Sequence, residues 1–411
     1  MKKVFIVSYY FPPLNSMAAK RYGTMCKYFK ACGYEAYILT TTINECGYLG
    51  AKRDLEVPIP LENIIRIGKE KQIKGIQEKV IHWFNGILYK RKFCSRAIMG
   101  YDELLWYEKV RKKIDWEKFK DIDIIIGTYG PIGNLYIAKY LSDKLKCFYV
   151  ADIRDLISEW QEAEDGYRRC YKIDQMIEKM LLSSANGIVT TTHGLKKILQ
   201  NKYNSKRVIT VYNGWDKTQI GQRGHSEEKY LYYAGSLYEH RLDGFGLLLN
   251  ALKKINEKEN IKLIVRSIGP KKLDDKARKM VAKMGMTSYI TILPSAPFEV
   301  INEEQREAYI HIILSSVQEE NIDQMVTVPG KTYELMNEKA PVLAITSKKS
   351  DLAKILAYTN KGIATTSEDE IIQFILHDHN QYIGNNHIRK FSREYQAKRL
   401  CGFMDEIVKG K

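Results

Sequence analysis

The residues best suited to chemistry lie in the second half of the chain. Gly235-Ser236-Leu237 stands shortly before Arg241, and a later segment reads Pro329-Gly330-Lys331-Thr332-Tyr333-Glu334. One arginine and one lysine that reach a cleft supply the charge needed to hold a diphosphate and to neutralise it as it departs. The carboxylate of Glu334 can accept hydrogen bonds from both hydroxyls of a ribose. This combination predicts a nucleotide site.

A second set of candidates lies near the amino terminus. Tyr10-Phe11-Pro12-Pro13 leads through Asn15 and Ser16 to Arg21. The prolines make the loop rigid, and the free N–H groups at the start of the helix that follows favour an anion. A stiff turn that binds nothing fits the same residues.

Two further motifs follow predicted strands. Gly127-Thr128-Tyr129-Gly130-Pro131-Ile132-Gly133 lets the backbone approach a ligand closely, although it does not match the dinucleotide fingerprint. Asp152-Ile153-Arg154-Asp155 places carboxylates at a strand end, where one can contact sugar hydroxyls or help to remove a proton from an attacking hydroxyl. A structural ion-pair network is the alternative for these residues.

Spacing argues against other chemistries. A phosphate-binding loop of the P-loop kind needs a glycine where Met325 stands before Gly330-Lys331-Thr332. No spacing of Asp, Glu and His suggests a metal, so that we expect neither a metal nor a cofactor, and we interpret His193 and His240 as polar loop residues.

These residues need a framework of parallel strands and helices. Apolar runs, many of them rich in β-branched residues, alternate with helical periodicity, as βα units require. In the first half we predict strands at 3–8, 35–40, 122–126, 148–151, 187–191 and 208–211. Ser16 is predicted to cap a helix that Gly33 ends. In the second half we predict five strands, at 230–234, 261–267, 289–293, 310–314 and 342–345.

The length of the chain and its composition fit two such domains. A chain of 411 residues exceeds the size at which one hydrophobic core stops growing. We predict an α/β protein with two facing Rossmann-like doubly wound domains and a cleft between them, over 1–216 and 217–387, with a polar linker at 217–229 and a closing helix over 388–411. The seven scattered cysteines suggest reduced thiols, and the amino terminus does not resemble a signal peptide, so we expect a cytoplasmic protein.

The positive charge is concentrated in the first half. The net charge is +16, of which residues 1–216 carry +12 (36 Lys and Arg against 24 Asp and Glu). The stretch from Arg66 to Arg96 has apolar residues at near-helical spacing and predicts a basic amphipathic helix. Such a helix can lie on an anionic membrane leaflet, or it can pack on its own domain with its lysines solvated. Binding to nucleic acid is a third use of basic patches, but no motif supports it.

The order of the motifs resembles the retaining glycosyltransferases of family four, which have the GT-B architecture. The resemblance spans nearly the whole chain: Phe11-Pro12-Pro13 through Arg21, Asp152–Asp155, Asn213-Gly214-Trp215-Asp216, Tyr233–Tyr238 with Arg241, and Pro329–Glu334 followed by Lys339–Val342. It implies transfer of a sugar, with retention and without a metal, from a nucleotide-sugar donor to a saccharide acceptor. We expect a UDP-sugar and a lipid-linked acceptor in the synthesis of capsule, O-antigen or exopolysaccharide.

The resemblance also assigns roles to individual residues. Catalytic roles fall to Asp152, Arg241 and Lys331. The donor is expected at Gly235, Ser236, Leu237, Arg241, Lys331, Thr332 and Glu334. The acceptor is expected at Pro13, Asn15, Ser16, Arg21, Gly130, Asp152, Arg154 and Asp155. The positive first half suits a peripheral membrane enzyme at the inner leaflet.

The sequence departs from the family pattern at two places. Many members carry a glutamate eight positions before the equivalent of Glu334, where this chain has Val326. Glu319, Glu320 or Asp323 could replace it. Ser16-Met17 also replaces the usual glycine pair of the first loop. Two other functions therefore stay open: a GT-B nucleotide-sugar epimerase, and a non-catalytic nucleotide-sugar-binding scaffold protein.

Overall fold

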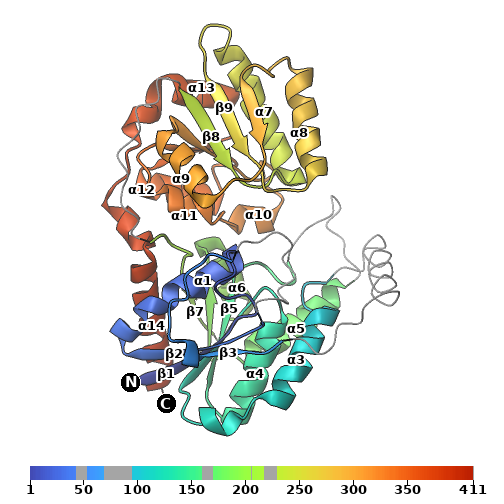
Figure 1. Cartoon of the computed structure of the whole chain (residues 1–411), viewed down its shortest axis with the longest axis vertical. Helices are drawn as coiled ribbons and strands as arrows, with labels where there is room; N and C mark the ends of the chain where they lie inside the picture. Colours follow the sequence, from blue (N-terminus) through green and yellow to red (C-terminus); the bar gives the residue numbers. More distant parts are fainter. Residues whose placement is uncertain (43–52, 69–94, 160–169, 205, 217–228, 411) are drawn as a thin grey trace. The chain divides into compact units, whose positions relative to one another are not determined.

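The computed structural model describes residues 1–42, 53–68, 95–159, 170–204, 206–216 and 229–410. It divides into two compact units, Met1–Asn213 with Arg393–Lys411, and Gly214–Ser392. Most of the predicted basic helix (69–94) and of the predicted linker (217–228) lies outside the described residues. Each unit is built on one parallel sheet (Figure 1).

The first unit contains a seven-stranded sheet with the order β3-β2-β1-β4-β5-β6-β7. Its strands are β1 (Lys2–Val7), β2 (Tyr34–Thr40), β3 (Ile64–Arg66), β4 (Ile124–Thr128), β5 (Phe148–Ile153), β6 (Gly187–Thr190) and β7 (Arg207–Thr210). The predicted strands are confirmed with shifts of one or two residues, but β3 was not predicted. It is three half-buried residues at the sheet edge, too short to show periodicity.

Helices cover both faces of this sheet. They are α1 (Met17–Met25), α3 (Tyr101–Lys113), α4 (Gly133–Leu145), α5 (Tyr171–Ser183), α6 (His193–Lys202) and α14 (Arg393–Lys409). Figure 1 shows α3, α4 and α5 together on one side and α14 on the other. The predicted cap of α1 is confirmed, because the Ser16 side chain accepts a hydrogen bond from the amide of Ala19 at 3.2 Å. Gly33 ends the helical segment after α1 with φ +84°.

The closing helix begins later than predicted and belongs to the first unit. Residues Asn386–Phe391 form a 3-10 turn of the second unit, and α14 starts only at Arg393. Its Leu400, Phe403 and Ile407 enter the core formed by α1 and the sheet. Gly187 makes room for them, because a Cβ atom there would lie 2.6 Å from Cζ of Phe403.

The second unit contains a six-stranded sheet with the order β10-β9-β8-β11-β12-β13. Its strands are β8 (Tyr230–Ala234), β9 (Lys262–Arg266), β10 (Ile290–Leu293), β11 (Ile310–Leu314), β12 (Val342–Ile345) and β13 (Gly362–Thr365). Its helices are α7 (Glu239–Ile255), α8 (Lys271–Lys283), α9 (Phe298–Glu307), α10 (Ile322–Val326), α11 (Lys331–Leu335), α12 (Asp351–Thr359) and α13 (Glu368–Gln373).

The prediction of five strands in this half was wrong by one. Strand β13 reads Gly-Ile-Ala-Thr, and its four residues, two of them small, are too few to show a strand pattern. Gly362 is required by its neighbour, because a Cβ atom there would meet the carbonyl oxygen of Val342. Among the described residues no helix is both long and apolar enough to cross a bilayer.

Replacing Phe403 by alanine should show that α14 is an integral part of the first unit. We expect Phe403→Ala to lower the free energy of unfolding by about 3–5 kcal/mol, because a buried aromatic ring leaves a cavity. Urea denaturation followed by circular dichroism measures the change. Arg399→Ala, at an exposed position of the same helix, is the control and should stay within about 0.5 kcal/mol of the wild type. Equal stability of both variants would contradict this packing role.

Candidate functional site

A compact group of cations surrounds the loop that follows β8. The loop begins at Gly235, whose φ of +151° is rarely adopted by other residues. A Cβ atom at this position would also lie 3.3 Å from Nζ of Lys331. Glycine therefore serves both the backbone turn and the close approach of the lysine.

Lys331, the first residue of α11, reaches back to the end of β8. Its Nζ donates a hydrogen bond to the carbonyl oxygen of Ala234 at 2.9 Å. The same atom lies 3.6 Å from the centroid of the Tyr233 ring, within range of a cation–π interaction. Both groups that contact the Lys331 ammonium here, a carbonyl oxygen and an aromatic ring, are uncharged.

Arg241, in the first turn of α7, approaches the same loop. Its Nη1 donates to the carbonyl oxygen of Ser236 at 2.8 Å, and it lies 3.4 Å from the hydroxyl of Tyr233. That hydroxyl donates to the same carbonyl oxygen at 2.8 Å. Tyr233 therefore contacts both cations, with its ring against Lys331 and its hydroxyl against Arg241. The positive end of the α7 dipole adds to the charge here.

The charge of these two residues is not compensated within the described part of the chain. No ion pair to a carboxylate is formed there by either Lys331 or Arg241, and Nε of Arg241 is buried without a hydrogen-bond partner. Burial, together with the neighbouring Arg241, holds the pKa of Lys331 well below its usual range. The pKa of His240 is lowered to about 4, mainly because the side chain is buried and also because the charge of Arg241 lies nearby. Such a site favours an anionic ligand.

The other predicted donor residues fall into two groups. Glu334 is half-buried and follows Lys331 by one helical turn of α11. The side chains of Leu237 and Thr332 are fully buried, and that of Ser236 nearly so. Leu237 and Thr332 therefore offer a donor only their backbone.

A pocket of about 390 Å³ lies beside the same loop and was not predicted. Its walls come from the residues after β9, the start of α8 and the residues after β10: Ser267, Ile268, Gly269, Lys271, Asp274, Asp275, Arg278, Pro294 and Ser295. Gly269 connects it to the loop, because a Cβ atom there would lie 3.4 Å from Cβ of Ser236. The positions directly after two neighbouring strands were the available signal.

Three acidic residues precede the position where Val326 replaces a glutamate. Glu319 accepts from the hydroxyl of Ser347 at 2.7 Å and pairs with Lys349 at 2.5 Å. Asp323 is buried within α10, whereas Glu320 is exposed. Glu319 is thus occupied elsewhere, and the replacement role stays a prediction for the other two.

In the first unit the predicted acceptor residues lie around a buried ion pair. Nε and Nη2 of Arg21 each donate to one oxygen of Asp152 at 2.7 Å. Nη1 donates to the carbonyl oxygen of Val211 and to Oδ1 of Asn213, at 3.1 and 3.0 Å. Both side chains are almost completely buried, at 1% and 0% exposure. For Asp152 this geometry favours the ion-pair alternative over direct contact with an acceptor, but its partner is Arg21 and not the neighbouring Arg154.

Arg154 holds the glycine-rich turn after β4. Its Nε donates to the carbonyl oxygen of Tyr129 at 2.6 Å and its Nη2 to that of Gly130 at 3.0 Å. Gly130 has φ +91°, and a Cβ atom there would collide with Nη2 of Arg154. Arg154 and Gly130 thus form one structural clamp at the end of β4 and β5.

The remaining predicted acceptor residues are half-buried. Asn15 donates to Asp54 at 2.8 Å, and Ser16 is engaged as the cap of α1. Pro13 and Asp155 are half-buried as well. Asp155 follows β5 directly and is the carboxylate of this motif that the pair with Arg21 leaves unused. Among the described residues, no cluster of three His, Cys, Asp or Glu side chains could hold a metal.

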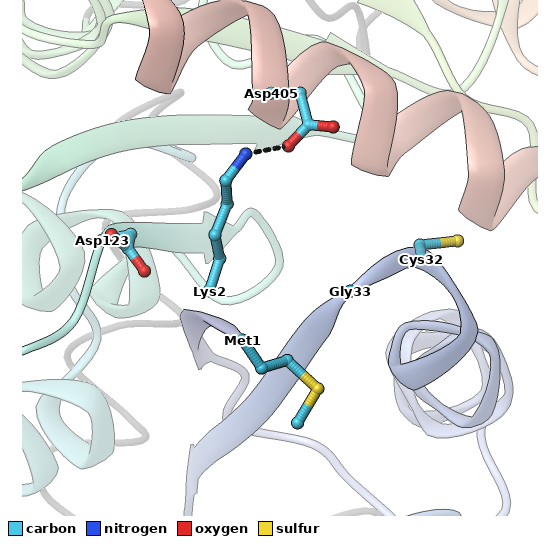
Figure 2. A pocket seen from close by; sticks show the side chains of 6 residues that line it. All are labelled: Met1, Lys2, Cys32, Gly33, Asp123 and Asp405. Atoms are coloured by element: carbon cyan, nitrogen blue, oxygen red, sulfur yellow. Dashed lines mark hydrogen bonds and ion pairs between the residues drawn. The ribbon is translucent and has the colours of Figure 1, made fainter.

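A second pocket of about 490 Å³ lies in the first unit, at the amino ends of strands β1, β2 and β4 (Figure 2). It is lined by Met1, Lys2, Cys32, Gly33, Asp123 and Asp405. Lys2 pairs with Asp405 of α14 at 2.5 Å, which fixes the helix to the amino end of β1. None of the predicted site residues lines this pocket.

Comparisons with known proteins agree with the architecture. No protein-family model matches the sequence, and a search of curated proteins gave no match. Among solved structures, sucrose-phosphate synthase from Thermosynechococcus elongatus matches with a TM-score of 0.66 and 12% identity over all of both chains. A TarM variant from S. aureus, in complex with fondaparinux, alpha-GlcNAc-glycerol and UDP, matches with 0.60 and 12% over 98% of this chain and 100% of that one.

A glycosyltransferase from Rickettsia africae ESF-5 matches with a TM-score of 0.58 and 13% identity, over 100% of this chain and 99% of that one. The chain has the GT-B fold. The prediction of two Rossmann-like domains is therefore confirmed.

The buried ion pair gives a prediction about stability. Asp152→Asn should lower the free energy of unfolding by about 3–5 kcal/mol, because it leaves the buried guanidinium of Arg21 without a counter-charge. The double variant Arg21→Met with Asp152→Leu should recover most of the loss. A double-mutant cycle in urea measures the coupling. If Asp152→Asn is as stable as the wild type, the pair is not structural.

The lowered pKa of Lys331 gives a prediction about proton uptake. A bound diphosphate raises this pKa, so that binding of inorganic pyrophosphate should take up a proton between the lowered pKa and the ordinary value of 10.5. Calorimetric titration in buffers of different ionisation enthalpy measures the uptake. The Lys331→Met variant is the control, since it keeps the protons of pyrophosphate itself. Equal uptake by both proteins would refute the assignment.

Proposed function

We propose that the chain is a glycosyltransferase that uses a nucleotide-sugar donor, a UDP-sugar, and transfers the sugar with retention of configuration. The observation that carries the proposal is the pair Arg241 and Lys331, two cations on one glycine loop with no carboxylate ion pair among the described residues. Cations held in this way suit a diphosphate leaving group.

The donor is expected to use the residues around this loop. Its diphosphate would contact Arg241 and Lys331, and its ribose hydroxyls would donate to Glu334. In the displacement, the bond from the anomeric carbon to the phosphate oxygen breaks while the bond to the acceptor oxygen forms on the same face. The acceptor proton passes to an oxygen of the departing diphosphate. The protein contributes orientation and stabilisation of the leaving group.

We propose that this reaction needs no divalent metal, because two side-chain cations already neutralise the diphosphate. An activity that depends on magnesium or manganese would overturn this part.

The acceptor is proposed to be a lipid-linked saccharide used in the synthesis of a surface polysaccharide. The excess charge of +12 in residues 1–216 supports this, since it suits an anionic lipid diphosphate at an inner membrane leaflet. Asp155, together with Pro13, Asn15 and Ser16, is the candidate contact surface. Arg21, Asp152, Arg154 and Gly130 would hold this surface in position.

The two alternative functions differ from this proposal in their products. An epimerase would change the donor sugar without any acceptor, and a scaffold protein would bind the donor without turnover. Incubation of the protein with labelled UDP-sugars, with and without a membrane lipid extract, separates the three. Release of UDP only in the presence of lipid supports the transferase.

Binding of the donor nucleotide gives the sharpest first test. UDP, GDP, ADP and CMP should be compared in a thermal-shift assay, and we expect UDP to raise the melting temperature. A ligand at about 100 times its Kd stabilises the native state by about 2.7 kcal/mol. Lys331→Ala and Glu334→Ala should lose this shift.

The control for this assay is Lys339→Ala. It removes an exposed lysine shortly after α11 and should keep the shift. If no nucleotide or UDP-sugar stabilises the wild-type protein, the proposed donor site does not exist.

A further inference from the structure

Helix α5 buries carboxylates together with Leu181 and Leu182, and it exposes apolar side chains. Its two acidic residues, Asp174 and Glu178, are buried at 0% and 1% exposure. Asp174 accepts from the hydroxyl of Ser95, and Glu178 accepts from the amide and hydroxyl of Ser158 at 2.9 and 2.8 Å. Surface helices of soluble domains usually show the reverse pattern.

The exposed face of the same helix is apolar. Ile173, Met176 and Met180 are 46%, 72% and 46% exposed. Their spacing of three and then four residues places them on one stripe along the helix. These exposed fractions are large for side chains of their size, and they occur on one helix face.

The charged residues on this face are both basic. Lys172 and Lys179 are exposed, and neither forms an ion pair among the described residues. Since both acids of the helix point inward, the solvent side of α5 combines an apolar stripe with lysines and carries no carboxylate. Figure 1 shows α5 beside α3 and α4, on the side of the unit away from α14.

The segment that contacts α5 also exposes apolar side chains. Ser95, which donates to Asp174, also accepts from the amide of Ile98 at 3.0 Å. Ile98 and, in the first turn of α3, Tyr101 and Leu104 are exposed as well. Asp102 in the same turn of α3 is exposed as well, so these side chains lie outside the basic apolar face of α5.

We propose that the exposed face of α5, with Ile173, Met176, Met180, Lys172 and Lys179, docks on an anionic lipid bilayer. Apolar side chains that enter the interface, beside lysines at the level of the headgroups, are the arrangement that such surfaces bind. A lipid surface is favoured over a protein partner because both exposed charges that α5 itself carries, Lys172 and Lys179, are positive and the net charge of the first half is +12. The proposal builds on the proposed function, since it places the first unit where a lipid-linked acceptor resides.

Vesicle sedimentation tests the surface directly. The full-length protein should sediment with vesicles of equal parts phosphatidylglycerol and phosphatidylcholine, and far less with pure phosphatidylcholine. Ile173→Ser with Met176→Ser and Met180→Ser should weaken binding at least about tenfold, through loss of buried apolar area. Lys172→Gln with Lys179→Gln should weaken it about fivefold for each lysine.

Matched variants keep the test specific. Leu61→Ser with Ile383→Ser removes two apolar side chains elsewhere that are at least as exposed as those of α5. Lys253→Gln with Lys258→Gln removes two exposed lysines of the second unit. Both should bind vesicles like the wild type, and circular dichroism should show all variants folded. Wild-type binding by the α5 variants, or equal losses in the control variants, would overturn the proposal.

Two further outcomes separate lipid binding from self-association and from the proposed function. If the wild type ignores both kinds of vesicle but is a dimer that the triple serine variant converts to a monomer, the face binds a second copy and not lipid. The thermal shift with UDP is measured on the same proteins. A variant that loses vesicle binding but keeps this shift separates the lipid surface from the donor site. If UDP does not shift the melting temperature of the wild type, only the proposed function is refuted.

Discussion

The buried pair between Arg21 and Asp152 is the interaction on which the first unit depends most. One guanidinium joins the middle of α1, the end of β5 and the residues after β7, because it contacts Asp152, Val211 and Asn213 together. A buried ion pair of this kind is weak as a source of net stability, but removal of one partner is costly. The loops at the carboxyl edge of this sheet, including those with Asp155 and Ser16, are therefore set by a polar contact inside the protein.

The second unit uses the same residue types in the opposite way. Arg241 and Lys331 converge on Gly235 and Ser236, where they contact carbonyl oxygens and the side chains of Tyr233 and Tyr238. In the first unit the buried arginine is paired with Asp152, whereas in the second unit burial and the neighbouring Arg241 lower the pKa of Lys331. Among the described residues, the first unit therefore supplies a carboxylate to its buried cation, and the second unit supplies none to Arg241 or Lys331.

The sequence allowed the fold class, most strands and the Ser16 cap to be predicted, because buried strands and helix caps leave local signals. The strands β3 and β13 were missed because they are short and, in β13, rich in small residues. The pair between Arg21 and Asp152 could not be predicted, since the two residues lie 131 positions apart in the sequence. For Asp152, Arg154 was the nearer candidate partner. The pocket beside Gly269 also depends on residues from three separate elements, which no local pattern reveals.

Helix α5 shows where stability alone does not explain the choice of residues. Glu178 needs Ser158, Lys202 and Tyr203 to be satisfied in its buried position, with Tyr203 donating at 2.9 Å and Lys202 at 2.8 Å. A methionine in that place would need no such partners, and a glutamate at the position of Met176 would be solvated without cost. The fold instead keeps both carboxylates inside with Leu181 and Leu182, and leaves Ile173, Met176 and Met180 outside. This arrangement is understandable if the outer face of α5 meets an environment other than water.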